Sequence, residues 1–496
     1  MPIHIPGLTT AGALAPLPGG QDDQNRRMHS ATRRRILSGQ WRQDLEEAVR
    51  QFFPDTTTAK FGHLDTSRNL LSTVVGQQAV LYTSIPKVDH LDVDEDTTAE
   101  WEAQLAEDGL WDLLDGNLRL TIGARENLMR VDWVGASTVT EGEDVPGHLL
   151  FRVVPADLVF AIAEPETPDE PSVLFEARLR VVTIEGEKAE RWTWDYVDLT
   201  GAEPVYKILL PHKDTSNPQE ARDITGEVTG MDDLSGPRFP WWVNGEPAMP
   251  YVLYHAHRTG RLWDTWRFSE LVDATLKVGV YWTFWGFLLR DCAHPQRWMV
   301  DGDIMGAGVK GAGSSARRQV DADPATILQL VSTGNAFQTG QWQAAADPER
   351  LQLAIDAFGL RAMVHGGMHA GDFERQGNAE SGFAISLKSE AMRRLQRQLT
   401  PRIERGDRTL IGLAAGLSNR NTGTALPESD WNIRYAGVEM SAPERLARLQ
   451  EAQAKLTMGT GSLVDVVLAE NPGMTREEAV ARLEQIREER RLFPAE

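Results

Sequence analysis

Apolar residues at helical spacing dominate the first part of the chain. Trp41, Leu45 and Val49 recur every fourth residue before Pro54, so they lie on one face of a predicted helix that ends at the proline. This helix follows an arm rich in proline and glycine, which we predict to be flexible, from residue 1 to about 25. The next two stretches also have the pattern of helices: 64–85 and 98–114.

The pattern changes between residues 118 and 210, where short β-type runs alternate with glycine and proline turns. From Arg178 polar and apolar residues roughly alternate, as in an antiparallel strand with one buried face. We expect such runs to form antiparallel sheets, so the predicted fold class is α+β. The runs are Leu118–Ile122, Leu149–Val154, Leu174–Ile184 and Arg191–Val197.

One predicted helix, Phe268 to Arg290, contains a segment that is apolar on every side, Val278–Leu289. At 1.5 Å per residue the helix is roughly 35 Å long. A helix that is apolar all round must be covered on all sides, and neighbouring copies of the chain could cover what one chain leaves exposed. Burial inside a large single-chain core is the alternative. The large aromatic residues of the segment are Tyr281, Trp282, Phe284, Trp285 and Phe287.

The second half of the chain alternates between helices and segments rich in glycine. A glycine- and alanine-rich stretch, 301–316, precedes a strand or short helix at 326–331. Pro348 fits the first turn of a helix that runs to about Val364, and glycines interrupt all periodicity over 365–384. The later predicted elements are the long helix Ile385–Leu417, which Pro401 should kink, the strand Trp431–Tyr435, and two short helices that begin at capping boxes, Ser441 with Glu444 and Thr475 with Glu478.

Composition and charge restrict the class of protein. The chain has 496 residues, so we expect roughly two to four domains or sub-domains. Its formal net charge is -21, which argues against a protein that clamps nucleic acid tightly but permits one that lets it pass. No run of about 18 apolar residues and no basic leader occur, so we predict neither a membrane span nor a signal peptide. The single cysteine, Cys292, excludes an intrachain disulfide framework.

No motif in the sequence assembles an active site. The segment Gly306–Gly313 is similar to a phosphate-binding loop, but glycine follows Lys310 where Ser or Thr would hold Mg²⁺. A Gly-x-Ser-x-Gly elbow is missing, and Cys292 is interpreted as structural rather than as a nucleophile. The best metal candidates are His365, His369, Asp372 and Glu374. Two glycines separate the histidines where a zinc-binding pair needs a continuous helix, so loop histidines that bind nothing are favoured.

A basic cluster lies near the start of the first helical region. Its favoured interpretation is a solvated helix face, and contact with nucleic acid or an acidic partner is the alternative. The cluster consists of Arg26, Arg27, Arg33, Arg34 and Arg35.

The order of elements in the second half is specific: an apolar helix, a glycine-rich insertion, a second helix, a glycine-rich loop and a long, basic, kinked helix. The most telling residues are Gly377–Met392, with the sequence GNAESGFAISLKSEAM, and the tail Glu470–Ala479, ENPGMTREEA. The arrangement resembles the portal proteins of tailed bacteriophages. The resemblance covers approximately residues 40 to 490 in the order of elements, and the amino-acid sequence itself is similar in these two segments alone.

The resemblance implies a portal fold assembled as a ring. The first 40 residues have no clear counterpart in it, and 209–250 could be an extra insertion. The implied parts are an N-terminal arm and helix (1–54), a wing (55–267, β-rich over 118–210), two stem helices (268–290 and 348–364), a clip (291–347), a tunnel loop (365–384), a long kinked helix with a wing strand (385–440) and a helical crown (441–496).

The resemblance also implies what such a protein does. Portal proteins form rings, usually of twelve copies, at one vertex of the capsid, and double-stranded DNA passes through the central channel without sequence recognition. The terminase large subunit docks on the ring during packaging, and a head-completion or adaptor protein takes its place afterwards; the major capsid and scaffolding proteins are further partners. The expected role is genome packaging, retention and ejection in the virion, after assembly in the host cytoplasm. It is not enzymatic and requires no cofactor or metal.

The site residues implied by the resemblance fall into four groups. Basic residues that contact phosphate, or pair with acids of a neighbouring subunit, would be Lys388, Arg393, Arg394 and Arg397. The DNA-facing tunnel loop would contain Gly371, Asp372, Phe373, Glu374, Arg375, Gln376, Gly377 and Asn378. Docking on the clip would involve Lys310, Arg317 and Arg318. Apolar contacts between subunits would come from Tyr281, Trp282, Trp285 and Phe287.

Two other classes of protein remain alternatives. The first is a metal-dependent nuclease or hydrolase that uses His365, His369, Asp372 and Glu374. The second is a minor capsid protein or a scaffold without a channel. Bound metal would distinguish the first, and mass in solution would distinguish the second.

Overall fold

The computed structural model divides into two compact units. The first unit contains residues 1–370 and 398–436, and the second unit contains 371–397 and 437–496. The described residues are 16–52, 64–135, 137–138, 144–145, 147–184, 187–212, 217–231, 233–257, 259–263, 270–293, 296–300, 327–330, 338–342, 347–368, 382–435, 442–459, 461–470 and 476–492.

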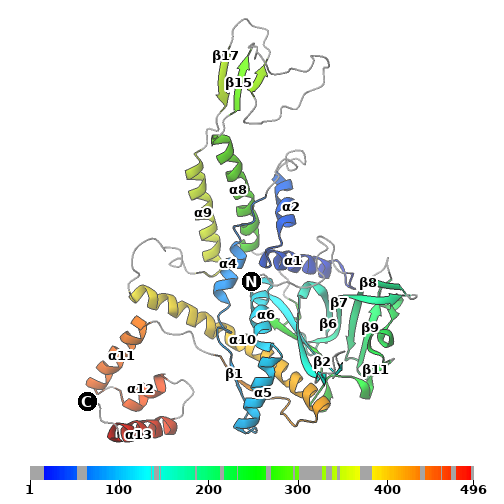
Figure 1. Cartoon of the computed structure of the whole chain (residues 1–496), viewed down its shortest axis with the longest axis vertical. Helices are drawn as coiled ribbons and strands as arrows, with labels where there is room; N and C mark the ends of the chain where they lie inside the picture. The colour runs from blue at the N-terminus through cyan, green and yellow to red at the C-terminus, as the bar shows by residue number, and fades with distance from the viewer. Residues whose placement is uncertain are drawn as a thin grey trace. The chain divides into compact units, whose positions relative to one another are not determined.

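Helices form the beginning of the first unit (Figure 1). They are α1 (Gln21–Leu37), α2 (Arg42–Phe52), α4 (Leu70–Gln78), α5 (Glu95–Glu107) and α6 (Leu110–Ala124). Side chains cap two of them, because Asn69 accepts from the backbone of α4 and Asp94 from that of α5. Trp41, Leu45 and Val49 are fully buried, which confirms the predicted apolar face of α2.

The stretch predicted as one helix, 98–114, belongs to two. Gly109 adopts a left-handed conformation between α5 and α6, which separates them. The prediction of a β-run at Leu118–Ile122 is wrong, because this stretch lies inside α6. Leu118, Leu120 and Thr121 are all buried there, so the helix is covered on several sides and lacks the one-sided period that would have identified it.

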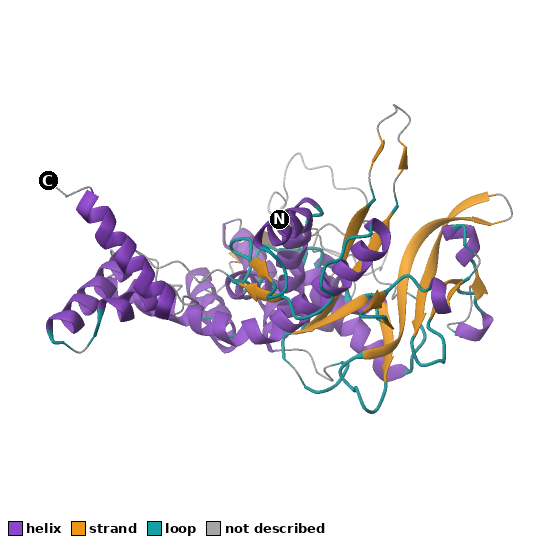
Figure 2. Cartoon of the chain, turned by 90° about the horizontal axis from the view of Figure 1, so that it is seen from below, coloured by secondary structure: helices purple, strands orange, loops and turns teal. Residues whose placement is uncertain are grey.

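Two antiparallel sheets contain the longest strands among the described residues of the first unit; strands are shown in orange in Figure 2. The smaller has the order β14-β2-β5, and the larger has the order β10-β9-β8-β7-β6 with β11 also paired to β9. The α+β class predicted from the sequence is confirmed. The strands of the smaller sheet are β2 (Glu126–Val134), β5 (His148–Val154) and β14 (Tyr251–His255). Those of the larger are β6 (Val159–Ala163), β7 (Pro171–Ile184), β8 (Glu187–Asp198), β9 (Val205–Leu210), β10 (Arg222–Asp223) and β11 (Leu234–Ser235).

Three short sheets and several single turns complete the described residues of this part of the chain. The most distant pairing joins β1 (Lys87–Asp89) to β18 (Asn432–Arg434), with Val88 opposite Ile433. The other short elements are β3 (Ser137–Thr138) with β4 (Asp144–Val145), β12 (Trp242–Val243) with β13 (Glu246–Pro247), the helix α7 (Thr225–Thr229), and single 3₁₀ turns at 156–158, 218–220 and 236–238.

Two long helices, α8 (Glu270–Ala293) and α9 (Pro348–His365), lie side by side (Figure 1). Asp347 caps α9 through the backbone N–H groups of Glu349 and Arg350, and Pro348 occupies the first turn as predicted. Between the two helices in sequence lies a three-stranded sheet of order β16-β15-β17. Its strands are β15 (Gln296–Val300), β16 (Ile327–Leu330) and β17 (Gln338–Trp342).

The longest helix, α10 (Gly382–Thr422), contains Pro401, and the boundary between the two units falls at Arg397. Two glycines one turn apart let other backbone segments cross it closely. A Cβ on Gly412 would collide with the carbonyl oxygen of Glu428, and one on Gly416 would lie 2.5 Å from the carbonyl oxygen of Trp242. The second unit also contains α11 (Ala442–Thr457), α12 (Leu463–Glu470) and α13 (Arg476–Leu492). Helices α11 and α13 begin directly after the predicted capping residues Ser441 and Thr475.

Candidate functional site

The helix pair α8–α9 is antiparallel, and side-chain contacts fix its register. The rings of Tyr281 and Phe358 meet edge to face with centroids 6.4 Å apart. Further along α8, the indole N–H of Trp285 donates to the carbonyl oxygen of Pro348 at 2.9 Å. Advancing along α8 therefore corresponds to going back along α9. The β15–β17 sheet consequently lies at the end of the pair where α8 finishes and α9 begins (Figure 1).

The inner side of α8 packs against the N-terminal helices. Gly279 lets α2 approach, because a Cβ there would lie 2.9 Å from the indole of Trp41 and 3.0 Å from Leu45. On the α4 side, the backbone N–H of Leu71 donates to the hydroxyl of Thr275 at 3.2 Å. Glycine and threonine thus fit this helix against its neighbours, and the chain itself covers one side of the apolar segment.

The aromatic residues of α8 differ in how much the chain covers them. Trp282 is 9% exposed and stacks on Trp285, with ring centroids 4.6 Å apart and an interplanar angle of 16°. The guanidinium of Arg68 lies 4.3 Å from the centroid of Trp282. Phe287 is half-buried, whereas Tyr281 is 42% exposed. Contacts within the chain therefore hold the two tryptophans, and Tyr281 is the most accessible of the four residues predicted for subunit contacts.

Exposed apolar side chains continue onto α9. We call the exposed apolar side chains of the two helices the stem residues. An ordinary monomer surface carries single exposed apolar residues, and several on one helix pair favour an interaction surface. The stem residues are Tyr281, Leu289, Leu351, Leu353, Phe358 and Val364, which are 37% to 63% exposed.

A hydrogen bond connects the end of α9 to α4 near the start of the predicted tunnel loop. Gln78 donates its side-chain amide to the carbonyl oxygen of Gly366 at 2.9 Å, and Gly367 has a φ of +95° that glycine adopts readily. His365 is exposed in the last turn of α9. The predicted tunnel-loop residues Gly371–Asn378 lie outside the described residues, and so do the three other metal candidates, His369, Asp372 and Glu374, whereas the end of the predicted loop, 382–384, belongs to α10. Among the described residues, no group of three or more His, Cys, Asp or Glu side chains could hold a metal ion.

The other predicted site residues lie in different parts of the chain. Arg393 is half-buried near the start of α10, and Arg394 and Arg397 are exposed. Lys388 is in the same helix, but its side chain is outside the described residues, as are the clip residues Lys310, Arg317 and Arg318.

The basic cluster of α1 does not form a solvated face, so the prediction for these residues is wrong. Arg34 holds Asp157 with two hydrogen bonds, at 2.9 and 2.7 Å, and Arg35 holds Asp44 at 2.6 Å. Arg27 and Arg33 are 2% and 1% exposed. Arg34 thus attaches α1 to a distant part of the chain, whereas Arg27 and Arg35 pair with acids nearby in sequence, Asp23 and Asp44.

A buried charge network joins the two large sheets, and sequence reasoning missed it. Arg130 on β2 donates to Asp195 of β8 at 2.6 Å and to Glu176 of β7 at 3.1 Å. Arg152 on β5 holds Glu176 with two further hydrogen bonds, and Arg180 holds Asp195 with two others. Burial alone would raise the pKa of Glu176, but Arg152 and Arg130 hold it well below its usual range. The network therefore stays ionised and fixes one sheet against the other.

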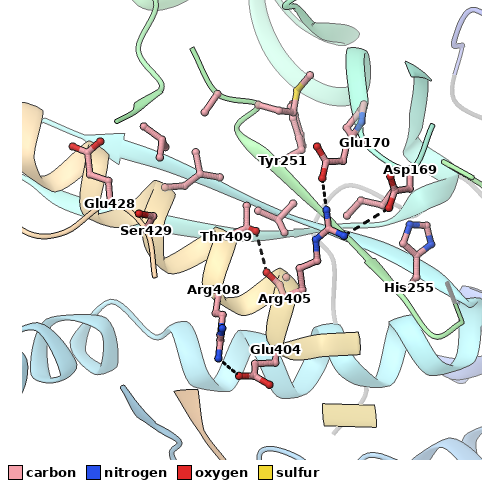
Figure 3. Close-up of a pocket in the computed structure, with 18 of the residues that line it drawn as sticks. Asp169, Glu170, Tyr251, His255, Glu404, Arg405, Arg408, Thr409, Glu428 and Ser429 are labelled. Atoms are coloured by element: carbon pink, nitrogen blue, oxygen red, sulfur yellow. Dashed lines mark hydrogen bonds and ion pairs between the residues drawn. The ribbon is translucent and has the colours of Figure 1, made fainter. Parts of the chain in front are cut away.

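A cavity of about 740 Å³ lies between β14, the turn before β7 and α10 (Figure 3). Arg405 reaches across it to Glu170 at 2.5 Å and to Asp169 at 3.8 Å. Arg408 pairs with Glu404 on the same helix. Ion pairs between residues of the lining thus neutralise Arg405 and Arg408.

No helix among the described parts of the chain is long and apolar enough to cross a lipid bilayer. A comparison with protein-family models gave no match for the sequence, and neither did one with curated proteins.

Proposed function

We propose that the protein is a portal protein of a tailed bacteriophage, which forms a ring-shaped channel for double-stranded DNA at one vertex of the capsid. The observation that carries the proposal is the antiparallel helix pair α8–α9, with a small sheet inserted between its helices and a long, proline-containing helix after it. This is the order of stem, clip, stem and kinked helix in portal proteins. The other sheets of the first unit would then form the wing, and α11–α13 the crown.

The stem residues support assembly into a ring. Each is a large apolar side chain left partly in water by a single chain, although the opposite side of α8 is well packed. Covering such side chains contributes about 25 cal/mol for each Å² removed from water. In a closed ring every copy presents the same surfaces to its neighbours, so all copies would gain this contribution equally.

The charge of the chain supports passage of DNA rather than tight binding. Binding of DNA phosphates requires local positive charge from lysine and arginine. A chain with a net charge of -21 has no overall excess of positive charge. Residues 371–378 would face the moving DNA, and Lys310, Arg317 and Arg318 would take part in docking terminase and later the head-completion protein. Major capsid and scaffolding proteins would surround the ring during assembly in the host cytoplasm.

Deletion of Gly371–Asn378 tests the proposed channel. We expect the variant to assemble into the same particles as the unaltered chain, because the stem residues are untouched, but to package or retain the genome poorly. The measurement is the DNA content of particles assembled with each form. Normal packaging by a variant that assembles normally would contradict a DNA-guiding role for this segment.

A further inference from the structure

Asp407 in α10 is fully buried and accepts hydrogen bonds from three tyrosine hydroxyls. Tyr82 and Tyr435 donate to its Oδ2 at 2.6 and 2.5 Å, and Tyr254 donates to its Oδ1 at 2.9 Å. The rings of Tyr82 and Tyr435 meet edge to face with centroids 5.9 Å apart. We call these four residues the tyrosine–aspartate cluster.

The cluster joins parts of the first unit that are far apart in sequence. Tyr82 follows α4, Tyr254 belongs to β14, and Tyr435 directly follows β18. Gly406 allows the close approach of Tyr254, because a Cβ there would lie 2.5 Å from its ring. The second unit resumes at Gly437. The cluster therefore fastens the chain to α10 at the point where it leaves the first unit.

The surroundings of Asp407 make its carboxyl group easier to protonate than that of an aspartate in water. Burial raises the pKa of Asp407 to about 6, although the three tyrosine hydroxyls act in the opposite direction. The carboxylate of Glu404, one turn earlier on the helix, adds to the increase. The groups that face Asp407 from the other packed elements are these tyrosines, which burial and the carboxylate keep neutral by raising their pKa values. Once the cluster opens to water, Asp407 regains its ordinary pKa of 3.8.

We propose that the tyrosine–aspartate cluster is a proton-dependent latch that holds the end of β18 against α10 most firmly when Asp407 is protonated. The direction follows from linkage, because the closed form binds a proton more tightly than the open form. Protonation therefore stabilises the closed form fully below pH 3.8, and this stabilisation is lost as the pH rises through 6. The proposal does not depend on the portal assignment. It predicts that residues 431–435 separate from α10 more often as the pH rises from acidic to neutral.

Hydrogen exchange of the full chain tests the latch. The readout is the opening equilibrium of peptides that contain residues 431–435, corrected for the intrinsic pH dependence of exchange. With pKa values of about 6 closed and 3.8 open, opening should become about tenfold more frequent between pH 5 and pH 7.5 and then level off. Asp407→Asn keeps the size and one acceptor of the side chain but cannot ionise, so its opening should not change with pH in this range.

Two further variants make the outcome decisive. Tyr435→Phe removes one donor, so residues 431–435 should open more often at every pH, while a reference peptide from β7 exchanges as before. Glu404→Gln is the matched control, since it removes a nearby carboxylate but leaves the latch titratable. The proposal is overturned if opening in the unaltered chain does not depend on pH, or if Asp407→Asn keeps the full dependence. If Asp407→Asn does not fold, Tyr435→Phe decides instead: exchange of residues 431–435 that equals that of the unaltered chain overturns the proposal.

Discussion

Arg130 lies between the two large sheets with 2% of its surface exposed, and three carboxylates surround its guanidinium. Removing such charges from water costs several kcal/mol each, and the cost is offset only where every charge finds partners. Here Glu176 also pairs with Arg152, and Asp195 also pairs with Arg180. The hydroxyl of Tyr251 completes the arrangement by donating to Glu176 at 2.8 Å. The geometry of both sheets therefore depends on single side chains.

Substitution of Arg130 by methionine tests this dependence. The variant keeps apolar contacts but leaves the buried carboxylates of Asp195 and Glu176 with fewer partners, so we expect it to lose about 3–5 kcal/mol of the free energy of unfolding. Arg222→Ala is the control, because Arg222 pairs with Glu227 at the surface and its loss should change stability by less than about 1 kcal/mol. Urea unfolding measures both. Equal effects of the two substitutions would contradict a special role for the buried network.

At the scale of elements, α8 combines a packed side with an accessible one. Gly279 and Thr275 admit α2 and α4 on the packed side, whereas Tyr281 and Leu289 stay partly in water. This division explains why the segment is apolar all round although a single chain covers only part of it. Under the proposed function, the accessible side belongs to contacts between copies.

Substitutions at two neighbouring residues of α8 distinguish effects on folding from effects on assembly. Trp282→Ala should cost about 3–5 kcal/mol of stability in urea unfolding, because it removes a buried, stacked ring. Tyr281→Ser should cost about 1 kcal/mol or less, since the side chain is 42% exposed, but it should shift the protein toward smaller assemblies in sedimentation. If Tyr281→Ser assembles as fully as the unaltered chain, the stem surface does not have the role proposed for it.

For the whole molecule, prediction from sequence succeeded where the signal was local. The helix predicted at 268–290 is Glu270–Ala293, and that predicted at 348–364 is Pro348–His365. Long apolar runs, a proline in the first turn and capping residues determine such elements with little help from distant residues. The long helix predicted at 385–417 extends further at both ends, as Gly382–Thr422.

Features that depend on distant residues could not be predicted in this way. The pairing of β1 with β18 joins segments that are far apart in the sequence, and nothing near Asp407 indicates that three tyrosines surround it. The same holds for Arg34 of α1, because its partner Asp157 lies far along the sequence. Local charge and periodicity do not specify which distant side chains meet.

The central claim is that identical copies of this chain close into a ring around a channel. Mass measurement of the purified full-length protein in solution, combined with electron microscopy of the same sample, tests it most directly. The account predicts annular particles with a central hole and a mass about twelve times the 55.1 kDa of one chain. A monomer or dimer of 55.1 or about 110 kDa, without annular particles at any protein concentration, would contradict it.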